Sequence, residues 1–238
     1  CDLEKLPSLR ARMAFFLKNR PDLATLVSRW NEPGQGQTAL LSLLRGHRLK
    51  ALLHRALDPG EFLSDHGLRA VSRAYADQPF CFAWDGRDLG LAYEPAESRS
   101  RLFGGNSNWR GPVWMPVNYL LIAGLNRFHD YYGPDFRVEA PTGSGRTSSL
   151  REIARHLSHR LIGLSTRGSD GKRPVYGDSR IEQDDPNFRD HVLFYEYYDG
   201  DTGRGVGAAH QTGWSGLVAL LIQDIATAAF EASASEWP

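Results

Sequence analysis

Residues 106–134 read NSNWRGPVWMPVNYLLIAGLNRFHDYYGP, a polar loop with two tryptophans that runs directly into an apolar segment. In the second part of this stretch, apolar side chains recur at the three- and four-residue spacing of a helix face. Pro116 suits the first turn of a helix, and the Gly133-Pro134 pair ends it. The stretch therefore predicts a helix over residues 115–132 with a long loop before it.

Helical periodicity of the same kind recurs along the rest of the chain. We expect helices over residues 6–17 with a continuation over 23–30, and over 40–57, 149–166 and 212–230. A short β-hairpin is predicted near residues 79–93, with its turn at Asp85-Gly86. The connections are long, glycine-rich and aromatic-rich, and such loops inside a domain usually carry function. We therefore predict a mainly all-α fold with functional loops.

The composition narrows the class of protein. The 238 residues include 28 Lys plus Arg and 28 Asp plus Glu, and a net charge of zero gives no field that would hold a nucleic acid. The longest apolar run, Leu217 to Ile222, is too short for a membrane span. Cys1 and Cys81 cannot form a disulfide framework, and the charged first residues are unlike a signal peptide, so we expect a cytoplasmic protein. Because the chain starts at Cys1 without a methionine, we expect it to be a piece of a longer protein, and a processed amino end is the alternative.

Familiar cofactor and metal signatures are weak in this sequence. Gly203 to Gly207 is similar to a dinucleotide-binding loop, but too little chain follows it for a second parallel strand. His156 and His159 could share a helix face, but they lie among arginines without a third ligand nearby. We expect no cofactor and no catalytic metal, and a calcium ion on the acidic residues 182–185 stays an open alternative.

Two loops carry the residues that favour sugar chemistry. In residues 106–118, Trp109 and Trp114 lie five apart with Arg110 between them. Residues 194–214 read FYEYYDGDTGRGVGAAHQTGW and carry Glu196 between tyrosines. A pyranose offers apolar C–H faces to flat rings and a rim of hydroxyls to polar side chains; packing of the aromatics in the core is the alternative. The carboxylate of Glu196 is either an ion-pair partner or a catalytic group, and Arg110 could be its partner in both cases.

At these loops the sequence resembles glycoside hydrolase family 63. The resemblance rests on GGNSNWRGPVWMPVNYLL (104–121), FYEYYDGDTGRGVGAAHQTGWSGLV (194–218), LVSRWNEPGQGQTALLSLLRGHRLKALLHRALD (26–58), YEPAESRSRLFGG (93–105) and PTGSGR (141–146). The family includes processing mannosyl-oligosaccharide α-glucosidase, bacterial α-glucosidases and mannosylglycerate hydrolases, and the match is closest to the large bacterial members. The resemblance implies an (α/α)6 barrel, of which residues 1–238 would be the carboxyl-terminal half of the catalytic domain, with the amino-terminal half missing.

The resemblance also implies an inverting α-glucosidase-like mechanism. Inverting enzymes hold an acid and a base about 6.5–9.5 Å apart, with room for a water molecule. The position that matches the family's general base is Glu196. The family's general acid is an aspartate upstream, and Asp65, Asp85 and Glu97 are the nearest carboxylates, none in a comparable context. We therefore expect the acid before residue 1 and an isolated chain with little or no activity.

The remaining site residues follow from the same resemblance. The residues expected to line the sugar pocket are Trp109, Arg110, Gly111 and Trp114. Weaker candidates, for contact with sugar hydroxyls or for support of the pocket, are Asn118, Tyr195, His210, Gln211 and Trp214. Asp199 and Asp201 are further carboxylates that we expect to order the GDTG turn. The expected partners are an oligosaccharide or small α-glycoside substrate and the missing amino-terminal half, and the alternative function is a non-catalytic helical sugar-binding or scaffold module.

Overall fold

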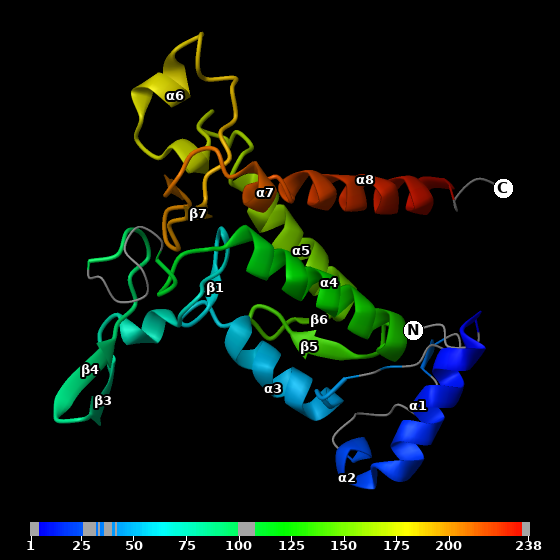
Figure 1. Cartoon of the computed structure of the whole chain (residues 1–238). Helices are drawn as coiled ribbons and strands as arrows, with labels where there is room; N and C mark the ends of the chain where they lie inside the picture. The colour runs from blue at the N-terminus through cyan, green and yellow to red at the C-terminus, as the bar shows by residue number, and fades with distance from the viewer. Residues whose placement is uncertain are drawn as a thin grey trace. The chain divides into compact units, whose positions relative to one another are not determined.

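The computed structural model describes residues 5–25, 32, 34–35, 40, 42–99 and 108–234. Two of the expectations above therefore lie outside the described residues: the helical continuation over 26–30, and Asn106 and Ser107 of the first loop. The described chain is mainly helical, with short strands in two-stranded antiparallel sheets (Figure 1). This confirms the mainly helical fold, and the (α/α)6 barrel stays a prediction. No helix among the described residues is long and apolar enough to cross a membrane.

The chain divides into two units, residues 1–55 with 123–153 and residues 56–122 with 154–238. The elements assigned mainly to the first unit are α1 (Pro7–Asn19), α2 (Pro21–Ala24), α3 (Gly46–Ala56), β5 (Arg137–Glu139) and β6 (Thr147–Ser149). The boundary falls within α4 (Met115–Tyr132) and α5 (Leu150–Gly163). The bounds of α4 confirm the helix predicted from its proline start and its Gly-Pro end.

Local side-chain hydrogen bonds act at the starts of helices α3 and α5. Helix α3 begins at Gly46 rather than at residue 40, because the Ser42 hydroxyl accepts a hydrogen bond from the Leu44 amide (2.9 Å) and so favours a turn there. Helix α5 starts on a reciprocal cap. The Ser149 amide donates to the Glu152 carboxylate (2.6 Å), and the Glu152 amide donates to the Ser149 hydroxyl (3.3 Å).

The second unit contains most of the long loops. Its elements are β1 (Leu63–Ser64), β2 (Gly67–Leu68), η3 (Arg73–Tyr75), β3 (Phe80–Trp84), β4 (Arg87–Leu91), η4 (Pro174–Tyr176), α6 (Arg180–Asp184), β7 (Tyr197–Tyr198), β8 (Gly205–Val206), α7 (Thr212–Ser215) and α8 (Val218–Ala234). The hairpin predicted near residues 79–93 is present as β3 and β4, paired from Phe80 with Leu91 to Trp84 with Arg87.

The last helix differs from its prediction over 212–230. It is divided into α7 and α8 at Gly216 and Leu217. The Ala219 amide donates to the Gly216 carbonyl (3.0 Å), a tight three-residue turn in place of the four-residue α-helical bond. Glycine is a poor helix former, which favours a break at this position. The short α7 that results places Trp214 against the core of the second unit.

Candidate functional site

A stack of aromatic rings forms the centre of the candidate site. The Trp114 ring stacks on Trp109, with ring centroids 3.8 Å apart and planes 4° apart, and on Tyr197, with centroids 4.7 Å apart. Trp214 lies tilted beside Trp114, at 5.3 Å between centroids. Trp114 and Tyr197 are fully buried, whereas Trp109 is 42% exposed. The stack therefore runs from the core to an indole ring at the surface.

A pair of backbone hydrogen bonds joins the two predicted loops. The Val113 amide donates to the Tyr198 carbonyl (2.8 Å), and the Tyr198 amide donates to the Val113 carbonyl (3.0 Å). The Trp114 indole N–H donates to the Asn108 carbonyl (3.0 Å), which fixes the ring in its own loop. This bridge brings the tryptophan loop against the segment that carries Glu196.

Gly111 is a close-packing position in the tryptophan loop. A Cβ at Gly111 would lie 2.6 Å from the Glu94 carbonyl oxygen and 2.7 Å from the Tyr93 ring. Gly111 is itself buried, so its absent side chain serves loop packing.

Arg110 is buried and forms an ion pair with Glu94. Asn108 supports this pair: its side-chain oxygen accepts from the Arg110 amide (3.0 Å), and its amide nitrogen donates to the carbonyls of Glu94 (2.8 Å) and Ala96 (2.6 Å). Arg110 therefore anchors its loop to residues 94–96. Glu94 was not singled out from the sequence, because nothing local to the YEPAE segment shows that it faces an arginine 16 residues away.

Glu196 lies next to the base of the aromatic stack. Its amide donates to the Ala208 carbonyl (2.9 Å), and a Cβ at Gly207 would lie 2.7 Å from its carboxylate oxygen Oε2. The side chain is partly buried. Burial raises the pKa of Tyr197, and the neighbouring negative charge of Glu196 raises it further. Glu196, Tyr197, Trp114 and Trp109 therefore form one continuous set of neighbours.

The weaker candidates divide between scaffold and surface positions. Asn118 is buried and is bonded to the backbone on both sides: it accepts from the Leu68 amide (2.8 Å) and donates to the carbonyls of Leu68 and Trp114 (3.0 Å each). Gln211 precedes α7, and its amide donates to the Phe194 carbonyl (2.8 Å). His210 is exposed beside that bond.

Tyr195 and the glycine-rich loop after it lie against each other. The Tyr195 ring touches Gly205, where a Cβ would collide with it, and burial raises the pKa of Tyr195. The Asp199 carboxylate accepts from the amides of Asp201 (2.8 Å) and Thr202 (3.1 Å), so it orders the GDTG turn as expected.

A buried network that the sequence did not suggest holds Asp201. Arg69 donates to the Asp201 carboxylate (3.0 Å) and to the Tyr93 hydroxyl (3.0 Å), and that hydroxyl donates to Asp201 (2.9 Å). Burial raises the pKa of Tyr93. Because Arg69 and Asp201 are 132 residues apart in sequence, no local pattern could have paired them.

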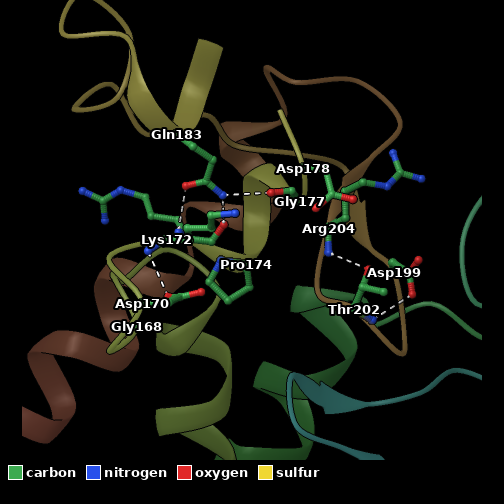
Figure 2. Close-up of a pocket in the computed structure, with 11 residues that line it drawn as sticks. Gly168, Asp170, Lys172, Pro174, Gly177, Asp178, Gln183, Asp199, Thr202 and Arg204 are labelled. Atoms are coloured by element: carbon green, nitrogen blue, oxygen red, sulfur yellow. Dashed lines mark hydrogen bonds between the residues drawn. The ribbon is translucent and has the colours of Figure 1, made fainter. Parts of the chain in front are cut away.

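Two cavities adjoin residues 195–207. One, of about 430 Å³, is lined in part by Tyr195 and Gly207, the residue that touches the Glu196 carboxylate. The other, of about 490 Å³, lies between the segment 168–183 and the loop of Thr202 and Arg204 (Figure 2). In the acidic run 182–185, Glu182 accepts a hydrogen bond from Ser179 and Asp185 accepts one from Asn187. In the part of the chain that the structure describes, no three ligand-type side chains converge as a metal site would require.

The second unit thus contains an exposed indole ring, that of Trp109, and a partly buried carboxylate, that of Glu196, on the two loops that the backbone bridge joins. The family model of the mannosylglycerate hydrolase MGH1-like glycoside hydrolase domain matches residues 36–215. The chain therefore belongs to this family of glycoside hydrolase domains.

Curated relatives agree with this family. The chain is 44% identical to an uncharacterized protein of Saccharomyces cerevisiae over 226 residues, which are 94% of this chain and 21% of that protein. It is 25% identical to the mannosyl-oligosaccharide glucosidase of the same yeast, over 74% of this chain and 15% of the relative. It is 27% identical to alpha-glucosidase 2 of Arabidopsis thaliana, over 49% of this chain and 11% of the relative.

The chain thus spans about a fifth or less of the length of these curated relatives. These relatives come from a yeast and a plant, so they give no support to the expectation that the chain is most similar to bacterial members of the family.

Proposed function

We propose that this chain supplies the general base and part of the sugar pocket of an inverting, α-glucosidase-like glycoside hydrolase. The observation that carries the proposal is the contact of the Glu196 carboxylate with Gly207, next to Tyr197 at the base of the stack that ends at Trp109. Family membership and the two glucosidase relatives support the reaction class. The substrate is an oligosaccharide or a small α-glycoside.

In this mechanism, the exposed Trp109 ring receives an apolar face of the sugar. The Glu196 carboxylate takes a proton from a water molecule, whose oxygen attacks the anomeric carbon from the face opposite the leaving group. The partly buried position of Glu196 limits competition from bulk water. The Arg110–Glu94 pair and the Asn118 bonds hold the tryptophan loop, so their role is to position the ring.

The general acid that protonates the leaving oxygen is proposed to lie on sequence outside this chain. In support, the chain spans only 21% of the 44%-identical yeast relative, which leaves ample sequence for a second catalytic group. General acid–base assistance is typically worth about 10²–10⁴-fold. The isolated 238-residue chain should therefore hydrolyse glycosides at least about a hundredfold more slowly than the full-length gene product.

The test compares full-length wild type with Glu196→Gln against α-glucosides and mannosylglycerate. We expect kcat to fall by more than about a hundredfold while substrate binding is retained, because the amide cannot accept the proton. Glu139→Gln is the matched control: Glu139 accepts a hydrogen bond from the Gly145 amide (2.8 Å), and glutamine can still accept it. An active wild type with an equally active Glu196→Gln variant would remove Glu196 from the mechanism.

The competing function is a sugar-binding module without catalysis. The exposed indole of Trp109, stacked on a fixed Trp114, favours it, because this platform is complete without Glu196. In that case the full-length protein would bind sugars but show no hydrolysis that depends on Glu196.

A further inference from the structure

The two cavities that adjoin residues 195–207 are neighbours, because they share lining residues. Arg204 and Asp178 line both the cavity of about 430 Å³ next to Gly207 and the cavity of about 490 Å³ in Figure 2. Each volume lies within the range of small-molecule pockets. Glu196 itself lines neither cavity, but Gly207, which touches its carboxylate, lines the first one.

The wall of the second cavity is held by a buried side chain. Gln183, only 6% exposed, accepts from the Arg173 amide (3.0 Å) and donates to the carbonyls of Arg173 (2.8 Å) and Gly177 (3.0 Å) (Figure 2). These bonds satisfy the glutamine and fix the turn over residues 173–177. The wall is therefore preorganised, which lowers the cost of ordering it around a ligand.

The Arg204 side chain packs against the turn over residues 173–177. Gly177 has a φ of +50°, and a Cβ there would lie 3.0 Å from the Arg204 Cδ atom, so the glycine makes room for the arginine stem. The guanidinium donates two hydrogen bonds to Glu97, at 3.0 and 2.9 Å. Asp178 and the Lys172 ammonium make no hydrogen bond or ion pair with any residue that the structure describes, so they remain available to a ligand.

The walls of the two cavities carry no surplus of positive charge. The second cavity is lined by three cations, Lys172, Arg173 and Arg204, and by three carboxylates, Asp170, Asp178 and Asp199. In the first cavity Arg204 faces the carboxylates of Glu97 and Asp178. An anionic ligand would need a surplus of positive charge, whereas sugar hydroxyls use donors and acceptors together.

We propose that these neighbouring cavities bind uncharged sugar units of an oligosaccharide whose terminal sugar lies at Glu196, with Arg204 and Asp178, which line both cavities, as the residues that select them. The inference rests on the proposed function for the placement of the terminal sugar. The inference adds that the preferred substrate is a neutral glycan with two or more sugar units beyond the terminal sugar. A glycoside whose aglycone carries a carboxylate is disfavoured.

The test measures binding to the full-length protein by calorimetry, with two probes. The neutral probe is a thio-linked maltotriose, which resists hydrolysis, and the anionic probe is mannosylglycerate. We expect the neutral probe to bind at least about tenfold more tightly. Asp178→Asn and Arg204→Gln should each weaken its binding about ten- to a hundredfold, a loss typical of a hydrogen bond to a charged group.

Matched variants separate this site from general effects. Asp135→Asn makes the same chemical change at an exposed aspartate outside both cavities, and it should leave binding unchanged. Arg204→Lys keeps the charge and should lose less affinity than Arg204→Gln. Equal or tighter binding of mannosylglycerate, or unchanged affinity in both Asp178→Asn and Arg204→Gln, would overturn the inference. Hydrolysis by Glu196→Gln is a separate readout, so a failure of the proposed function is distinguishable from a failure of this site.

Discussion

Two regions of the second unit are both rich in aromatic residues but bury them to different extents. In the hairpin of β3 and β4, Phe80, Phe82 and Trp84 alternate along one strand and share one face, where Trp84 is 70% exposed. In the stack at the candidate site, Trp114 lies buried between Trp109 and Tyr197. The difference is the anchoring between segments: the Val113–Tyr198 bridge holds the stack, whereas the hairpin ladder joins only its own two strands. Aromatic content alone therefore does not locate a site.

The largest expected effect breaks the stack at its centre. Trp114→Ala should lower the free energy of unfolding by about 3–5 kcal/mol, because it leaves a cavity between Trp109 and Tyr197. Urea unfolding followed by far-ultraviolet circular dichroism measures it. Trp84→Ala is the matched change in the hairpin and should stay within about 0.5 kcal/mol of wild type. Equal losses of unfolding free energy in the two variants would show that the buried stack and the exposed hairpin ring contribute alike to stability.

The next effect removes the ion pair that holds the tryptophan loop. Glu94→Gln leaves the buried Arg110 without its carboxylate partner, which should cost about 3 kcal/mol of unfolding free energy. The control is Glu97→Gln, whose exposed pair with Arg204 should contribute less than about 1 kcal/mol. Chemical unfolding of both variants checks the ranking. An unchanged free energy of unfolding in Glu94→Gln would show that the Arg110–Glu94 pair does not hold the loop.

A smaller effect, on kcat, is expected from a change next to the Glu196 carboxylate. Gly207→Ala places a methyl group against Glu196 and should reduce kcat of the full-length protein about ten- to a hundredfold, because the base is displaced. Gly143→Ala is a matched control: its φ of +82° is close to the +75° of Gly207, but its Cβ would meet open space. Similar kcat losses in both variants would point to backbone strain rather than to displacement of Glu196.

The smallest effect concerns the exposed rings. Trp109→Ala should weaken sugar binding about five- to tenfold, since the platform over Trp114 is lost. Trp84→Ala should leave the affinity unchanged even though that ring is more exposed. Titration with a thio-linked maltotriose compares the two variants. A larger loss of sugar affinity in Trp84→Ala than in Trp109→Ala would indicate that the sugar binds at the hairpin and not at Trp109.

Local signals made part of this structure predictable. The bounds of α4 follow from Pro116 and from Gly133-Pro134, and the β3–β4 hairpin follows from its Asp85-Gly86 turn, because each signal acts within a few residues. The start of α3 was misplaced because the apolar period continues upstream of Gly46 while Ser42 stabilises a turn. The sequence predicts an unbroken helix over 212–230, because one glycine is a weak signal against a strong apolar pattern.

The candidate site was predictable in its residues and not in its contacts. The sequence predicts Trp109, Trp114 and Glu196 on two loops. The contact between these loops depends on the bridge between Val113 and Tyr198, which are 85 residues apart in the chain. Arg110 was weighed as a partner of Glu196, and the structure pairs it with Glu94. Such pairings are properties of the folded chain, and no spacing rule in a single sequence contains them.

The near-parallel indoles of Trp109 and Trp114 have an optical consequence. Two indole rings with centroids 3.8 Å apart couple their excited states, so they should share a near-ultraviolet circular dichroism signal and quench each other's fluorescence. A sugar that settles on the outer face of Trp109 would change that signal without any added label. The site therefore carries its own spectroscopic reporter, and Trp109→Ala would silence it.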